Sequence, residues 1–174
     1  LALSSVFLIL ARNTDRSYGA AMRYLIIQVL SGVVLLAGIL MHAKATGSIA
    51  FENIGLKPLY TASSALDIGG LASWLILIAI GIKCCFPMFH NWLTDAYPEA
   101  TPTGTVFLSA FTTKVAVYAL ARTFVGTELL VYVGATMAMF PIFFAVIEND
   151  LRRVLAYSLI NQVGFMVCGI GIGT

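Results

Sequence analysis

Residues 81–102 read GIKCCFPMFHNWLTDAYPEATP, and this stretch carries a lysine, Lys83, inside a run of apolar residues. Pro87 follows four positions later, and a proline lacks the N–H that would bond the carbonyl of the fourth preceding residue. That carbonyl belongs to Lys83. One position therefore carries both an ammonium group and a freed backbone acceptor, and both need protein or water around them at membrane depth.

The chain as a whole is strongly apolar. Of its 174 residues, 60% are hydrophobic and 10% are charged, whereas soluble domains contain roughly 25% charged residues. Apolar segments of the length that crosses a hydrocarbon core of about 30 Å recur along it, without the alternation typical of a membrane β-barrel. The sequence predicts an all-α, polytopic transmembrane helix bundle in a lipid bilayer.

Composition argues against several other classes of protein. A net charge of +2 without a basic cluster argues against nucleic acid as a partner. The three cysteines lie in apolar segments and show no metal-ligand spacing. The sequence contains no dinucleotide-binding or P-loop motif and no quinone or flavin signature. We therefore expect no cofactor, no metal site and a chain that is not catalytic alone.

We expect one transmembrane domain over residues 1–174. Residues 1–11 form part of a first helix, and a last span begins near Arg152. The chain starts without methionine inside an apolar segment and stops inside another, so we expect a fragment of a larger subunit, with four complete and two partial spans. The expected complete spans are 20–42, 70–93, 103–124 and 128–147.

The distribution of lysine and arginine predicts the orientation, because cytoplasmic links carry an excess of them. Five basic residues flank the links 12–19, 94–102 and 148–153, against three on the other side. This places the three links in the cytoplasm and the chain in a cell (inner) membrane. Trp74 and Trp92 would lie roughly 27 Å apart on one helix, which predicts one indole at each membrane interface.

Two lysines fall near the middle of expected spans, Lys83 in 70–93 and Lys114 in 103–124. An ionised lysine at the bilayer centre costs about 2.5 to 3.5 kcal/mol on insertion scales. Such a lysine either pairs with a structural acid or belongs to a proton or ion path, and its recurrence on consecutive spans favours the path. The alternative is a structural subunit whose buried lysines hold the helices together.

Neighbouring polar residues extend this candidate path. His90 lies seven positions after Lys83, on the same face of a continuous helix, where it could relay a proton; an interfacial histidine is the alternative. Tyr118 lies on the face of Lys114 at i+4. In the last span a polar stripe should face the bundle, where it holds waters or simply ties helices together. The stripe consists of Ser158, Asn161 and Gln162.

The acidic residues are distributed differently from the lysines. Asp95, Glu99, Glu148 and Asp150 fall at the expected cytoplasmic edge, and the sequence has no acid at mid-membrane. Either the acidic partner of the lysines lies outside this sequence, or the lysines are largely uncharged, because burial disfavours the charged form.

The run GIKCCFPMFHNWLTDAYPEATPTGTVFLSAFTTKVAVYALAR (81–122), together with ENDLRRVLAYSLINQVGF (148–165), resembles a known family. It is the family of proton-translocating membrane subunits shared by NADH:quinone oxidoreductase (complex I), Mrp-type cation/proton antiporters and membrane-bound hydrogenases. The resemblance implies a subunit of about 14 helices, with two inverted repeats and a discontinuous helix. Residues 102–104 depart slightly from the family pattern, which puts no key residue in doubt.

The resemblance also implies roles for single residues. Lys83 matches the lysine of the broken helix, and Lys114 matches the lysine that links the first half-channel to a central hydrophilic axis. His90 and Asp95 match polar positions of the segment PxxHxWLxDAY. In the family, a glutamate before the stretch that corresponds to LALSS pairs with the broken-helix lysine.

The function that the resemblance implies is proton translocation, or exchange of a monovalent cation such as Na⁺ for protons, through a lysine/water relay. The D-type subunit of a Na⁺/H⁺ antiporter is the expected type. A proton-pumping subunit of NADH:quinone oxidoreductase, driven by electron transport, or of a membrane-bound hydrogenase is the alternative. Other membrane subunits are the expected partners in each case.

Overall fold

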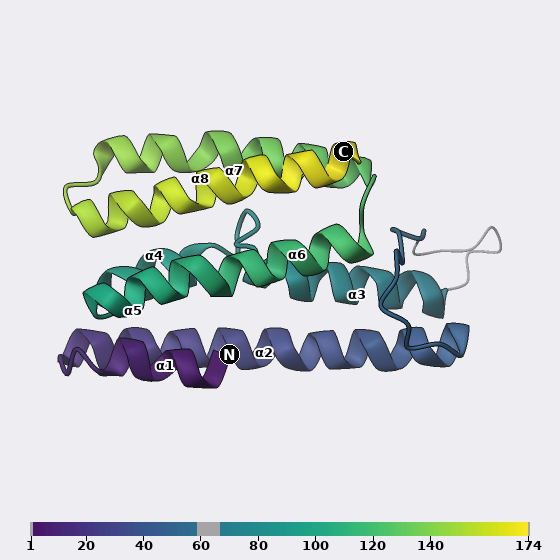
Figure 1. The fold of residues 1–174 in the computed structure, drawn as a ribbon, viewed down its shortest axis with the longest axis horizontal. Coiled ribbons are helices and arrows are strands. Elements are labelled where there is room, and N and C mark those ends of the chain that lie inside the picture. The colour runs from purple at the N-terminus through teal and green to yellow at the C-terminus, as the bar shows by residue number, and fades with distance from the viewer. Residues whose placement is uncertain (1, 59–66, 174) are drawn as a thin grey trace.

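The computed structural model describes residues 2–58 and 67–173, and all regular elements in these ranges are helices. They form three tiers (Figure 1). The lowest tier in that view holds α1 (Ala2–Leu10) and α2 (Asp15–Thr46), and the highest holds α7 (Glu128–Ile147) and α8 (Leu151–Ile172). Between them lie α3 (Ile68–Lys83), α4 (Asn91–Glu99), α5 (Pro102–Phe107), the π-helical turn η1 (Leu108–Thr112) and α6 (Thr113–Thr123).

Among the residues that the structure describes, four helical stretches are long and apolar enough to cross a membrane, namely Asp15–Thr46, Pro102–Thr123, Glu128–Ile147 and Leu151–Ile172. The predicted all-α, polytopic bundle is therefore confirmed. The last stretch has 22 residues, so the segment expected as a partial span is long enough for a complete one. α3 has only 16 residues, because the span expected over 70–93 is interrupted.

Local sequence explains where the helices begin. Thr14 and Ser17 form a capping box at the start of α2, each side chain accepting from the backbone N–H of the other. The Asp67 carboxylate accepts from the N–H groups of Gly69 and Gly70 in the first turn of α3. Thr101 caps α5, where Pro102 occupies the first turn and sacrifices no helical hydrogen bond.

The interruption lies between α3 and α4, in the connection 84–90. α3 ends at Lys83, and Cys85 and Met88 then adopt positive φ angles of 61° and 76°, which are costly for residues other than glycine. The unbroken helix expected from hydropathy is wrong here, whereas the discontinuous helix implied by the resemblance is confirmed. Pro87 lies inside this connection, so it accompanies a full break and not a mere kink.

Gly81 lets the connection fold back on α3. The N–H of Phe86 donates to the carbonyl of Gly81 at 2.9 Å. The phenyl ring then lies so close that a Cβ on Gly81 would meet a ring carbon at 2.5 Å. The break therefore depends on a small residue at position 81.

The expected polar link 94–102 is also corrected, because α4 remains helical as far as Glu99. Its buried side chains are Trp92, Leu93, Ala96 and Tyr97 with Pro98, which gives the segment an apolar face despite its acidic residues. The link is thus the second half of a broken helix that packs against α2 and α8.

The links 12–19, 94–102 and 148–153 meet at one end of the molecule, called here the charged end (Figure 1). Arg12 donates to the carbonyl of Pro98 at 2.6 Å and lies 3.4 Å from the Glu99 carboxylate. Arg152 donates to the same Pro98 carbonyl at 3.2 Å. Two guanidinium groups therefore hold the C-terminal end of α4, where a helix exposes carbonyls and favours positive charge.

Candidate functional site

Lys83 ends α3 and reaches α2. Its ammonium Nζ donates to the amide Oε1 of Gln28 at 2.8 Å. Gln28 is only 2% exposed, and it lies well inside the 32-residue helix α2. The first mid-span lysine is therefore bound to a neutral acceptor contributed by a helix that is distant in sequence.

The carbonyls at the end of α3 need partners, because a helix end leaves its last acceptors unpaired. The indole N–H of Trp92 donates to the Ile82 carbonyl at 2.9 Å. The Trp92 ring packs against Tyr24, with ring centroids 5.5 Å apart, and is 2% exposed. The prediction that Trp92 marks a membrane interface is wrong, because this indole stabilises the break inside the bundle.

Lys114 lies in the next span, in the first turn of α6 after η1. Its ammonium Nζ donates to the backbone carbonyl of Ser109 at 2.8 Å. A π-helical turn contains one residue more than an α-helical turn, and such turns occur frequently at functional sites. The second lysine is thus also bound to a neutral acceptor, at a second irregularity of the backbone.

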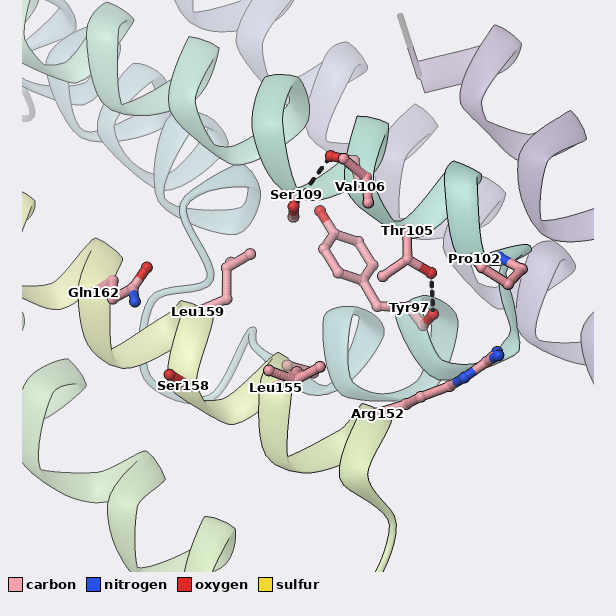
Figure 2. Close-up of a pocket in the computed structure, with 11 residues that line it drawn as sticks. Tyr97, Pro102, Thr105, Val106, Ser109, Arg152, Leu155, Ser158, Leu159 and Gln162 are labelled. Carbon is pink, nitrogen blue, oxygen red and sulfur yellow. Dashed lines mark hydrogen bonds between the residues drawn. The ribbon is translucent and has the colours of Figure 1, made fainter.

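Tyr97, a residue of α4, forms a hydrogen bond to the same π-helical turn. Its hydroxyl donates to the Leu108 carbonyl at 3.0 Å, in buried surroundings. The hydroxyl of Thr105 donates in turn to the Tyr97 carbonyl at 3.0 Å (Figure 2). The broken helix and the π-helical turn are therefore connected by side chain to backbone hydrogen bonds.

A cavity of about 400 Å³ lies beside this connection, between α8 and the α4–α5 region. Figure 2 shows that Ser158 and Gln162 approach it from one side, with Tyr97 and Ser109 opposite and Arg152 at another edge. Two of the three stripe residues predicted on α8 therefore line one cavity. The third, Asn161, does not line it; its Oδ1 is buried and has no partner among the described residues.

His90 lies at the end of the connection, next to α4. Its ring contacts Phe140 edge-on, with ring centroids 5.2 Å apart, and its Nδ1 is buried without a partner in the described part of the chain. The expectation that His90 shares a helix face with Lys83 is wrong, because the helix does not continue between them. A relay through His90 stays a prediction.

The remaining predicted residues lie away from the two lysines or face outward. Asp95 pairs with Arg23, and Glu99 pairs with Arg12. Tyr118 is 59% exposed. Within residues 2–58 and 67–173 all three ion pairs involve residues at or beside the charged end. No group of three or more metal-ligating side chains is found in these ranges.

Sequence reasoning missed Gln28, Tyr97 and Trp92 as members of the site. A signal for Gln28 was present, because it is an isolated amide in the apolar segment 20–42 and such a residue should face the bundle. Nothing comparable singles out the two aromatic residues. Their role follows from the carbonyls to which they donate in the two irregular backbone segments, and these contacts depend on tertiary packing.

The chain belongs to the family described as "NADH:quinone oxidoreductase/Mrp antiporter, TM", whose model matches residues 1–174. This family membership confirms the resemblance found in 81–122 and 148–165.

Individual relatives carry different names. The chain is 32% identical to NADH-quinone oxidoreductase subunit N of Desulforudis audaxviator, over 99% of this chain and 37% of that protein. It is 26% identical to the D subunit of the Na(+)/H(+) antiporter of Alkalihalophilus pseudofirmus, over 100% of this chain and 37% of that protein. The chain thus spans little more than a third of the length of these relatives.

A solved structure shares the fold. A chain of the Mrp complex from Dietzia sp. DQ12-45-1b superimposes with a TM-score of 0.81 at 26% identity, covering 96% of this chain and 33% of that one. The protein is therefore an antiporter-like, multi-pass membrane protein of this family.

Proposed function

We propose that the chain carries part of a path by which protons, or a monovalent cation such as Na⁺ in exchange for protons, cross the membrane. One observation carries the proposal. Two lysines on consecutive spans, Lys83 and Lys114, each donate to a neutral acceptor beside a backbone irregularity. Such groups are costly in a bilayer and mark ion or proton pathways.

The chemistry follows from these contacts. A lysine can exist as an ammonium or as a neutral amine, and burial makes the two forms closer in free energy. A neutral acceptor orients the ammonium without the strong attraction that a carboxylate would exert at the same distance. Lys83 and Lys114 can therefore gain and lose a proton, with Lys83 responding to an acidic partner and Lys114 passing the proton along the bundle.

We infer further that the chain acts as part of a larger subunit within a hetero-oligomeric membrane complex in a cell (inner) membrane, with the charged end in the cytoplasm. A Na⁺/H⁺ antiporter is the preferred parent, with this chain in its D-type subunit, supported by the Mrp-complex fold match and the antiporter relative. A proton-pumping subunit of NADH:quinone oxidoreductase, supported by the subunit N relative, or of a membrane-bound hydrogenase is the alternative.

The test is transport by the intact complex in proteoliposomes, with Lys83→Ala and Lys114→Ala. Both variants should lose proton movement while the complex still assembles. Lys44→Ala is the matched control, because Lys44 is exposed in the last turn of α2 and lies outside the proposed path. Full transport by either mid-span variant would reject the assignment of that lysine.

A structural role for the buried lysines is the second candidate. In that case the same substitutions would reduce the yield of assembled complex, and the complex that does assemble would transport at the normal rate. Measuring assembly by gel filtration and transport per assembled complex separates the two functions.

A further inference from the structure

Gln28 is a buried residue of α2 that contacts Lys83. Its Oε1 accepts from the lysine ammonium at 2.8 Å. Its Nε2 is buried and has no hydrogen-bond partner among the described residues. A buried amide donor without a partner is costly, so a site that retains one calls for an explanation.

The amide of glutamine has a property that a carboxylate lacks. Its oxygen accepts two hydrogen bonds and its nitrogen donates two, and the two ends exchange places when the terminal torsion turns by about 180°. An ammonium offers only donors, whereas a neutral amine also offers a lone pair that can accept. One glutamine side chain can therefore bind both protonation states of a lysine.

We propose that Gln28 is a positioning residue that binds Lys83 in both of its protonation states. The Oε1 atom accepts from the ammonium, as the structure shows. After the proton leaves, the amide turns and Nε2 donates to the lone pair of the amine. This inference rests on the proposed function, since it assumes that Lys83 changes its protonation state during transport.

The surroundings of Gln28 are suited to this task, because α2 and α3 are held at a fixed distance. Ser31, nearly one turn further along α2, donates to the carbonyl of Ala79 at 2.9 Å. Further along, a Cβ on Gly38 would meet the Ile76 side chain at 2.8 Å. These contacts pack the two helix backbones closely, and the amide can respond to Lys83 by turning about its own terminal torsion.

The experiment compares Gln28→Met and Gln28→Glu, two substitutions of similar size, by measuring the rate of proton transport against pH in vesicles that contain the intact complex. A methionine side chain offers only a weak acceptor and no donor, so it forms no strong hydrogen bond with either the ammonium or the amine form of Lys83. Loss of Oε1 disfavours the ammonium and loss of Nε2 disfavours the amine, but the hydrogen bond to the charged form is the stronger of the two. The alkaline limb of the rate profile should therefore move to lower pH, by about one pH unit.

Glutamate accepts from the ammonium but, when ionised, cannot donate to the amine. It should hold the proton on Lys83, move the alkaline limb to higher pH, and reduce the maximal rate by roughly tenfold or more. Opposite shifts of the two variants support the proposal, because a residue that only fills space would not move the profile in two directions.

Thr123→Ala is the control. It removes a buried side-chain hydrogen bond within α6, to the carbonyl of Ala119, without touching Gln28 or Lys83, so its pH profile should keep the position of its alkaline limb. If Lys83→Ala abolishes transport while both Gln28 variants retain the normal profile, the role of Gln28 is rejected and the proposed function stands. If Lys83→Ala transports normally, the proposed function itself is rejected.

Discussion

The charged end and the middle of the bundle pair their positively charged groups with different kinds of acceptor. At the charged end, guanidinium groups meet carboxylates, as in Arg12–Glu99 and Arg153–Glu148. In the middle, Lys83 and Lys114 meet an amide oxygen and a backbone carbonyl. Partners at the end are charged and partly exposed to solvent, so they contribute little to stability. Those in the middle are neutral, which under the proposed function leaves the proton free to move.

The largest expected effect comes from replacing the two lysines in the middle with arginine, the cation that forms the ion pairs of the charged end. Lys83→Arg and Lys114→Arg keep a positive charge and its donors, but an arginine is not deprotonated in proteins. Proton transport measured in proteoliposomes should fall by roughly 100-fold, the scale of a lost proton-transfer group.

The reciprocal control is Arg153→Lys, which keeps a cation 50% exposed beside Glu148 and should leave transport near its normal rate. If both arginine variants in the middle transported normally, a permanent charge would suffice there and proton exchange by the lysines would be rejected.

The second effect concerns the break that separates the two regions. Gly81→Ala places a Cβ against the Phe86 ring, so the connection 84–90 must shift, at a cost of about 1–3 kcal/mol. Thermal unfolding in detergent measures the loss. Gly32→Ala is the control, since no atom of the described residues lies within 4 Å of the added Cβ and alanine favours a helix by up to about 1 kcal/mol. Equal melting temperatures for the two variants would contradict the clash.

A third, somewhat smaller effect concerns the π-helical turn. Tyr97→Phe removes the hydroxyl that donates to the Leu108 carbonyl in buried surroundings, and the loss of such a hydrogen bond costs about 0.5–1.5 kcal/mol. Chemical unfolding of the purified complex measures this change. Tyr132→Phe, at a position that is 72% exposed, should remain within about 0.5 kcal/mol of the original protein, and a similar loss in both variants would refute the role of the bond.

The smallest effect is expected at the charged end. Arg23→Gln removes the ion pair with Asp95, whose side chains are 60% and 37% exposed, so stability should change by less than about 1 kcal/mol. High salt should reduce the difference further, because exposed charges are screened. A coupling free energy of several kcal/mol between Arg23 and Asp95, measured in a double-mutant cycle with Asp95→Asn, would contradict the weak stabilisation inferred for this ion pair.

Several features followed from local sequence. The spans over 20–42, 103–124 and 128–147 were visible because apolar segments of that length have few other uses. The break was indicated by Pro87 and by the family resemblance, while hydropathy alone predicted a continuous helix over 70–93. Its extent was not predictable, since the apolar face of α4 is short and is mixed with Asp95 and Glu99.

The sequence by itself determined the membrane-spanning helical class and the positions of the two lysines, because hydropathy and charge are properties of short segments. The tertiary structure decided what those lysines contact. Gln28 and Lys83 are separated by 55 positions in the chain, and the Ser109 carbonyl is presented by a turn whose extra residue leaves no mark in the apolar pattern. Such contacts depend on how the helices pack, which a one-dimensional pattern does not specify.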